Sequence, residues 1–185
     1  GQLYQVGSTQ REGQERMADK SSIHDVERDI MGRPSERNTT NLDLKRMKMI
    51  LDLLGDPQDS FRIIHITGTN GKGSTARMAE AICRAYGMRT GLYTSPHLEH
   101  VNERIAIDGQ RLSDDDFVEL WDQVKDFVAL VDAKMDAEGA PRMSFFEVLT
   151  AMAIWKFADA PVDVAIIEVG MGGRWDATNV LDADA

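Results

Sequence analysis

The stretch GTNGKGST, residues 68–75, has the residue types that hold the phosphate groups of a nucleotide. A phosphate chain needs backbone N–H groups that converge on it, a positive charge and the N-terminus of a helix. The glycines let the backbone come close, Lys72 supplies the charge, and two hydroxyl residues follow. The strict Walker pattern fails twice, because Ile66 stands at its first glycine position and Gly73 at its Ser/Thr position. We expect a nucleotide phosphate site, and the alternative is a strand-to-helix turn with a solvated lysine.

The segments around this stretch predict a strand before it and a helix after it. FRIIHIT, residues 61–67, is short, rich in β-branched residues and bounded by turn signals, which is typical of a strand covered on both faces. Residues 72–86 have helical periodicity and stop at Gly87. RTGLYT, residues 89–94, predicts a second strand, so the whole has the size of a βαβ unit.

The remaining elements predict an α/β fold in which a mostly parallel sheet is flanked by helices. We expect helices over residues 22–32, over 42–54 with Asn41 as N-cap, from Ser113, and from the capping box Ser144-x-x-Glu147 to about Phe157. Residues 95–104 read as a loop, and RIAI, residues 104–107, reads as a strand that ends in an Asp108-Gly109 turn. Residues 162–169 predict a third apolar strand, followed by a second glycine loop, GMGGRWDATN.

Composition indicates a single globular domain in a reducing compartment. The chain has 185 residues, of which 42% are hydrophobic, and only one cysteine. A net charge of −10 excludes a diffuse positive field for nucleic acid or an anionic membrane. No run of 18 apolar residues or basic-apolar leader occurs, so we expect neither a membrane span nor a signal peptide. Residues 1–20 are expected to be a disordered tail, and residues 21–185 a domain that looks truncated, since three parallel strands make a thin sheet.

Several motifs in order resemble the bifunctional dihydrofolate synthase/folylpolyglutamate synthase family of the Mur ligase superfamily. They are GTNGKGST, TSPHL, NERI, SFFE, EVGMGG and DATN, and the resemblance runs from about Ser22 to the last residue. In that family the loop reads GTNGKGS or GTNGKGT, so both departures from the Walker pattern are expected. The resemblance implies a P-loop-containing fold of the Mur ligase central-domain type, the N-terminal portion of the ATP-binding domain, without the C-terminal ligase domain.

The implied reaction is an ATP-dependent amide ligation with Mg²⁺. A carboxylate of dihydropteroate or a reduced folate attacks the γ-phosphate of ATP, and the amine of L-glutamate then displaces phosphate from the acyl phosphate. We also expect a cytoplasmic monomer that acts on small molecules. The 185-residue chain by itself is expected to be an incomplete, inactive fragment.

The family's functional residues transfer to positions that match its motifs. The implied nucleotide-binding residues are Gly68, Thr69, Asn70, Gly71, Lys72, Gly73, Ser74 and Thr75. Lys72 is also the implied catalytic residue, because it neutralises charge on the transferred phosphoryl group. The implied Mg²⁺ ligands are Ser95 and Glu168, which offer the hard oxygen atoms that this ion prefers. The implied pteroate-binding residues are Phe146, Asp176, Ser144, Ala177 and His97.

Other candidate residues have both a structural and a chemical interpretation. His65 lies inside an apolar strand, which favours a core histidine over a base. Cys83 has no accompanying His or Asp motif, which favours a structural role. His97 and His100 either touch substrate or only shape their loop. Arg104 either pairs with a substrate carboxylate or anchors the same loop.

Acidic residues occur in two places where a metal could bind. Asp114, Asp115 and Asp116 fall in the first turn of an expected helix, where they complement its dipole, so we do not expect a metal there. Glu168 is either a solvated strand end or a metal ligand, and its place after an apolar strand, facing the phosphate loop, favours the metal.

Three other functions compete with the folate ligase. Another Mur-type ligase would act on a cell-wall nucleotide precursor, but such enzymes carry a separate domain ahead of the loop. A non-catalytic nucleotide-binding fragment would bind Mg-ATP without turnover. A P-loop kinase or GTPase would need a Walker B aspartate or a base-reading motif, and we find neither.

Overall fold

The computed structural model describes residues 23–34, 44–66, 72–95 and 99–168. The expected tail over residues 1–20 lies outside these ranges, as do several predicted site residues, namely Gly68, Thr69, Asn70, Gly71, His97, Asp176 and Ala177. The backbone of Lys72 and Gly73 is described as part of a helix, and their side chains are not.

A five-stranded sheet forms the centre of the molecule, in the order β1-β5-β2-β3-β4. The strands are β1 (Arg62–Ile66), β2 (Thr90–Tyr93), β3 (Ile105–Ile107), β4 (Gln110–Arg111) and β5 (Val164–Glu168). β1, β5 and β2 are parallel neighbours, whereas β3 and β4 add two antiparallel pairings. The expected mostly parallel sheet is therefore a mixed one. The expected βαβ unit of β1, α3 and β2 forms with β5 inserted between its two strands.

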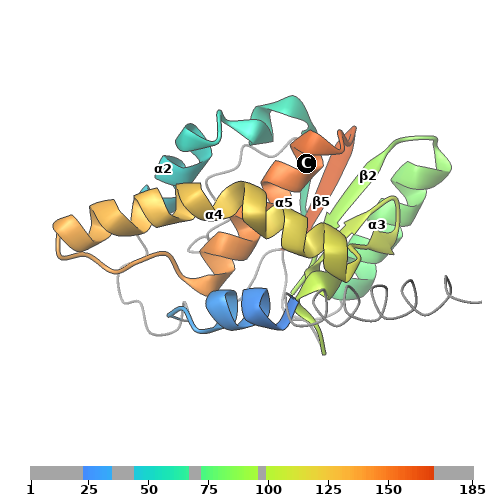
Figure 1. The fold of residues 1–185 in the computed structure, drawn as a ribbon. Coiled ribbons are helices and arrows are strands. Elements are labelled where there is room, and N and C mark those ends of the chain that lie inside the picture. Colours follow the sequence, from blue (N-terminus) through green and yellow to red (C-terminus); the bar gives the residue numbers. More distant parts are fainter. Residues whose placement is uncertain (1–22, 35–43, 67–71, 96–98, 169–185) are drawn as a thin grey trace, which may run out of the picture.

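One face of the sheet is covered by several helices. They are helix 23–31, α2 (Lys45–Leu53), α4 (Asp114–Ala137) and α5 (Phe145–Asp159) (Figure 1). Ten of the fifteen residues of α5 are buried, because this helix has the sheet on one side and α2 and α4 on the other. The Phe157 ring of this helix packs edge-on against Phe61, with ring centroids 5.9 Å apart. This face holds the main hydrophobic core.

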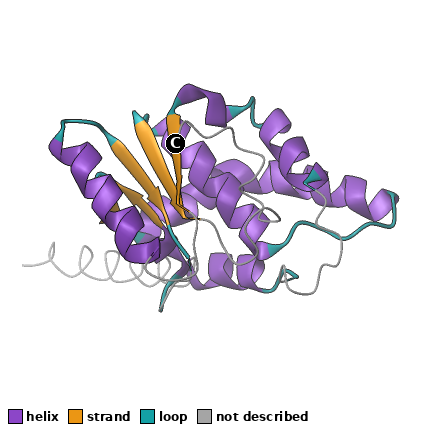
Figure 2. Cartoon of the chain, turned by 180° about the vertical axis from the view of Figure 1, so that it is seen from behind, coloured by secondary structure: helices purple, strands orange, loops and turns teal. Residues whose placement is uncertain are grey.

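The opposite face is covered, within the described residues, by α3 (Lys72–Ala85) alone (Figure 2). Ala76 is fully buried here and packs with Leu92 and Ile166 of the central strands. Glu80 fixes the middle of α3, since it accepts a 2.7 Å hydrogen bond from the Thr90 hydroxyl at the start of β2 and one of 3.0 Å from Arg84 Nε. The cluster on this face is much smaller than the main core.

The helix termini confirm one of two predicted caps and the predicted start of α4. The Ser113 hydroxyl accepts from the N–H of Asp116, and Ser144 forms the expected capping box with Glu147. The prediction for α2 is wrong, because the helix begins at Lys45 and Leu44 is its N-cap, with no side-chain cap hydrogen bond. Packing decides this start, since the first turn buries Arg46 and Met47 against the rest of the core. Two short 3-10 helices, η2 (Pro57–Ser60) and η3 (Val101–Arg104), occupy segments expected to be irregular.

Candidate functional site

The carboxyl ends of β1, β5 and β2 meet at one edge of the sheet. Ile66, the last residue of β1, is opposite Glu168, the last residue of β5. Tyr93, the last residue of β2, is opposite Ile167, so the chain leaving β2 passes level with Glu168. Adjacent strands lie about 4.8 Å apart. Ser95, two residues beyond β2, therefore belongs to the same edge as Glu168.

The predicted phosphate loop joins two elements at this edge. β1 ends at Ile66 and α3 begins at Lys72, which is the strand-then-helix arrangement that the motif requires. Ser74 and Thr75 lie in the first turn of α3 and are exposed. The N-terminus of a helix of fourteen residues thus opens at the end of the central strands, where its dipole favours an anion.

Glu168 is an unusual residue for a strand end because it is only 2% exposed. The four residues before it in β5 are buried too, so the solvated-strand-end interpretation is wrong. A buried carboxylate needs a compensating charge or hydrogen bonds. With the partly buried Ser95, Glu168 offers the oxygen donor set that suits Mg²⁺. No group of three or more His, Cys, Asp or Glu side chains that could hold a metal occurs in the described ranges.

The SFFE motif forms the N-terminus of α5. Ser144 is 1% exposed, and its hydroxyl accepts a 3.1 Å hydrogen bond from the N–H of Glu147. Phe146 is 5% exposed, and its ring lies 6.0 Å from that of Tyr93. Phe145 is the more exposed of the two rings. Ser144 and Phe146 are therefore buried at the start of α5, close to Tyr93 at the end of β2.

Arg104 connects the NERI motif to this helix start. The residue is 6% exposed, and its guanidinium carbon lies 5.7 Å from the centre of the Phe145 ring. Its carbonyl accepts a 3.0 Å hydrogen bond from the N–H of Thr94, just after β2. These contacts support the loop-anchoring interpretation of Arg104. The cation over the ring adds a modest attraction.

Other candidates have structural roles in this fold. Cys83 packs against the small cluster under α3, as predicted. Asp114 is in the first turn of α4 and accepts a 3.0 Å hydrogen bond from the Asn102 amide, which agrees with the predicted dipole role of this acidic turn. His100 is exposed and caps η3. His65 is partly buried in β1 opposite Ile167.

One buried and one partly buried ion pair near the start of α5 were not predicted. Arg46 Nε in α2 donates to both carboxylate oxygens of Glu147, at 2.9 and 3.2 Å. Arg33 donates to Asp132 in α4 at 2.8 Å, and Asp132 also accepts from the N–H of Met143 at 3.0 Å. The partners are about a hundred residues apart in the chain, so no local pattern points to them. The capping-box pattern in the sequence points to Glu147 but not to its partner Arg46.

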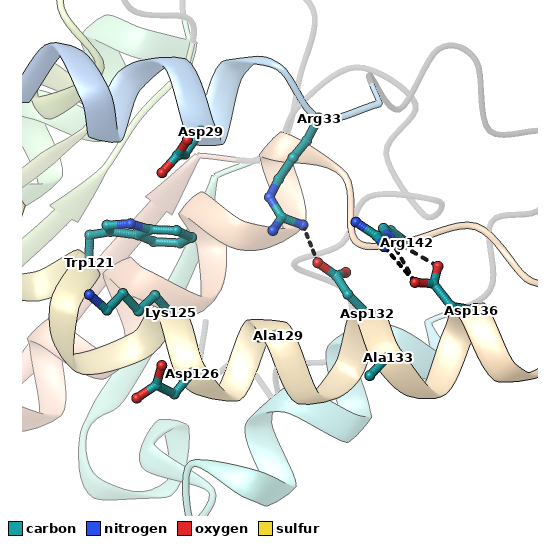
Figure 3. Close-up of a pocket in the computed structure, with 10 residues that line it drawn as sticks. All are labelled: Asp29, Arg33, Trp121, Lys125, Asp126, Ala129, Asp132, Ala133, Asp136 and Arg142. Atoms are coloured by element: carbon teal, nitrogen blue, oxygen red, sulfur yellow. Dashed lines mark hydrogen bonds and ion pairs between the residues drawn. The ribbon is translucent and has the colours of Figure 1, made fainter.

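A cavity of about 500 Å³ lies away from these motifs, between helix 23–31 and α4 (Figure 3). Its charged walls are largely paired within the protein, through Arg33 with Asp132 and Arg142 with Asp136. The hydrogen bond from Arg142 lowers the pKa of Asp136 below its ordinary value. None of the predicted site residues within the described ranges lines this cavity.

Comparison with known proteins identifies relatives of this chain. The chain is 55% identical over 143 residues to the dihydrofolate synthase/folylpolyglutamate synthase of Mycobacterium tuberculosis. Its fold matches the structure of Mycobacterium tuberculosis folylpolyglutamate synthase in complex with ADP, with a TM-score of 0.84 and 50% identity over 89% of this chain. The chain is homologous to the dihydrofolate synthase/folylpolyglutamate synthase family. The predicted Mur ligase central-domain type of fold is thereby confirmed.

A second solved structure, a complex of FPGS with AMPPCP and folate, matches 90% of the chain with a TM-score of 0.72 and 36% identity. No family model matches the chain. Relative to these synthases the chain is short. The matched segment is 76% of this chain but only 29% of the curated Mycobacterium tuberculosis synthase. The structural match covers 36% of the chain solved with ADP. Among the described residues, no helix combines the length and apolar character needed to cross a membrane.

Proposed function

We propose that this chain supplies the nucleotide-binding part of an ATP-dependent ligase that joins L-glutamate to dihydropteroate or to a reduced folate. One observation carries the proposal. The phosphate-loop motif connects β1 to α3 at the same strand edge as Glu168 and Ser95. The relatives support it, since one with this fold was solved with ADP and another with AMPPCP and folate.

The reaction transfers a phosphoryl group and then forms an amide. A carboxylate oxygen of the pteroate or folate bonds to the γ-phosphorus of ATP, and ADP leaves with the electrons of the broken O–P bond. The glutamate amine then bonds to the acyl carbon, phosphate departs, and the amine loses a proton to solvent. Protein groups contribute chiefly by positioning and by neutralising charge.

The loop residues and Lys72 would hold the phosphate groups at the N-terminus of α3. Backbone N–H groups of Gly68 to Gly73 and the hydroxyls of Ser74 and Thr75 are our proposed phosphate contacts. We propose that Lys72 neutralises charge on the transferred group, and that Ser95 and Glu168 hold Mg²⁺ at the strand edge. When bound, this ion would screen the charge repulsion between phosphate oxygens and the incoming carboxylate.

The pteroate would bind beside the start of α5, where we expect Asp176, Ala177 and His97 to approach it. Ser144 and Phe146 are buried, with the Ser144 hydroxyl bonded to Glu147. We therefore propose that these two residues shape the pteroate pocket from beneath. The more exposed Phe145, backed by Arg104, is the ring that the fold presents at this position.

The proposed ligase acts on small molecules in the cytoplasm, as a monomer. The net charge of −10 disfavours nucleic acid and anionic membranes as partners.

A chimera tests the function directly. Residues 23–185 would replace the matching segment of the Mycobacterium tuberculosis synthase, to which the chain is 50% identical in structure-based alignment. We expect this chimeric ligase to release phosphate from ATP only when Mg²⁺, L-glutamate and dihydropteroate or a reduced folate are all present. Phosphate release that instead depends on a UDP-linked cell-wall precursor would favour another Mur-type ligase, and none with any substrate would refute the proposal.

For the 185-residue chain itself, a specific observation favours binding without turnover. The chain covers only about a third of the relatives that perform the reaction. We propose that it binds Mg-ATP but releases no phosphate, which titration calorimetry beside a phosphate assay would test. Turnover by the isolated chain would contradict this.

A further inference from the structure

Two fully buried hydroxyl side chains meet where the end of β2 packs on α5. Tyr93 is the last residue of β2 and Thr150 lies in the second turn of α5, and their side-chain oxygens are 3.1 Å apart. The Thr150 hydroxyl donates a 2.7 Å hydrogen bond to the carbonyl of Phe146, one turn earlier. Because a threonine hydroxyl has a single proton, Tyr93 is the donor in its bond to Thr150.

A second link joins the same two elements. The N–H of Thr94 donates to the carbonyl of Arg104 at 3.0 Å, and the guanidinium of Arg104 lies over the Phe145 ring. The Tyr93 ring in turn lies 6.0 Å from the ring of Phe146. Two consecutive residues at the end of β2 are therefore connected to the first two residues of α5.

These links lie between the two halves of the proposed site. Ser95, the proposed Mg²⁺ ligand, follows Thr94 directly in the chain. The start of α5 is where we propose that the pteroate binds. Phosphoryl transfer needs the attacking carboxylate in line with the γ-phosphate, and a misplacement of about 1 Å can lower the rate about a hundredfold. The spacing between the end of β2 and the start of α5 therefore matters for the proposed reaction.

Packing alone does not require the two hydroxyl groups. Phenylalanine in place of Tyr93 and valine in place of Thr150 would fill nearly the same space, and replacing both partners of a buried hydrogen bond by apolar groups is often nearly neutral for stability. A fully satisfied buried polar network instead favours one arrangement of the elements that it joins. The hydroxyl pair thus indicates a role in geometry.

We propose that Tyr93 and Thr150 are positioning residues, which hold Ser95 and the Mg²⁺ edge at a fixed distance from the start of α5. Both side chains are fully buried, so they act through Ser95 and Phe146 and do not touch a ligand themselves. This role rests on the proposed function, since it concerns the same metal and pteroate sites.

Titration of ATP into the 185-residue chain, with Mg²⁺ and with a chelator, tests the metal side of this role. We expect Tyr93→Phe and Thr150→Val each to reduce the gain in affinity that Mg²⁺ gives about fivefold, the size expected for one lost hydrogen bond. Affinity for metal-free ATP should stay unchanged, because the phosphate loop is not altered. Thr150→Ser should keep most of the gain, since its hydroxyl can make both bonds.

Thr90→Val is the matched control. The Thr90 hydroxyl is as deeply buried and donates a 2.7 Å hydrogen bond to Glu80, but it lies at the opposite end of β2. This variant should lower the melting temperature and leave the Mg²⁺-dependent gain unchanged. A gain reduced equally in Thr90→Val, a gain lost in Thr150→Ser, or a full gain in both Tyr93→Phe and Thr150→Val would overturn the positioning role.

The unchanged chain separates this role from the proposed function. If it failed to bind ATP, or bound ATP no better with Mg²⁺, the proposed nucleotide and metal site would itself be refuted, and the positioning role with it. If it bound Mg-ATP as expected and the variants behaved like it, only the positioning role would be wrong.

Kinetics of the chimeric ligase test the alignment of the two substrates. Tyr93→Phe should lower kcat about tenfold and change KM for the pteroate less than about twofold, because misplaced reacting groups slow the chemical step without weakening the contacts to each substrate. Thr90→Val should leave kcat unchanged. A raised KM with an unchanged kcat in Tyr93→Phe would overturn the positioning role.

Discussion

The two faces of the central sheet differ in how completely they are buried. Helix 23–31, α2, α4 and α5 cover one face with a large core, whereas α3 alone covers the other within the described residues (Figure 1). The thinly covered face borders the strand edge where β1 ends, where α3 begins and where Glu168 lies. The two faces therefore differ in role, since one contributes stability and the other borders the proposed ligand site. The well-packed face holds most of the hydrophobic core, and the other face borders the proposed nucleotide site.

The largest effect should come from a cavity in the well-packed face. Phe157 is fully buried and its ring contacts Phe61, so Phe157→Ala should lower the free energy of unfolding by about 3–5 kcal/mol. On the α3 face, Leu92→Ala should cost about 2 kcal/mol, because a thin layer can relax into the space. Urea denaturation of the two variants measures both values. An equal or greater loss for Leu92→Ala would remove the distinction between the faces.

Breaking the buried ion pair at the start of α5 should be nearly as damaging. Arg46→Met leaves Glu147 buried without its cation, and we expect a loss of about 3 kcal/mol. Arg46→Met combined with Glu147→Leu removes both charges and should recover much of that loss, although the capping box is then lost too. Thermal unfolding of the single and double variants checks this. If the double variant lost more stability than the two single variants together, the broken ion pair would not be the cause of the loss in Arg46→Met.

Substitutions at the strand edge should affect ligand binding more than stability. In the chimeric ligase, Glu168→Gln and Ser95→Ala should each raise the Mg²⁺ concentration for half-maximal activity at least about tenfold, because even residues that only orient metal ligands have effects of that size. Ser74→Ala is the control and should have a smaller effect, since Gly73 stands in the position of the Walker Ser/Thr. A larger effect of Ser74→Ala would show that the ligands are wrongly assigned.

The smallest effect should come from the surface of α4. The Arg142 guanidinium lowers the pKa of Asp136, so this pair stabilises the fold above the ordinary aspartate pKa near 3.8, and the stabilisation is lost as pH falls through the lowered value. Because the pair is exposed, Asp136→Asn should reduce stability only slightly at neutral pH. The difference from the unchanged chain should vanish in acid. A difference that persists in acid would require a cause other than this charge pair.

The local pattern of the sequence predicted the elements around the phosphate loop within one or two residues. β1, α3, β2 and β5 follow from short apolar runs and helical periodicity, which are local signals. Strand order is not local, and the insertion of β5 between β1 and β2 could not be derived from spacing. The predicted cap of α2 failed for the same reason, because tertiary packing of Arg46 fixed where that helix begins.

The sequence predicted which strand edge forms the candidate site, but not which side chains are exposed there. Motif order and the rule that parallel sheets bind ligands at their carboxyl ends brought Ser95, Glu168 and the loop together. Which of two adjacent rings faces outward depends on the exact phase of α5, so Phe146 in the core and the more exposed Phe145 could not be distinguished beforehand. The Arg46–Glu147 pair joins residues 101 positions apart, beyond any local pattern.

The central claim is that the strand edge below α3 is a nucleotide site in this chain. Titration calorimetry of Mg-ATP into the 185-residue chain, with Lys72→Ala as the paired variant, tests it most directly. We expect one binding site in the unchanged chain and a strong loss of affinity in Lys72→Ala, because the phosphate charge is then no longer neutralised. Absence of binding in the unchanged chain, or equal affinity in both proteins, would contradict it.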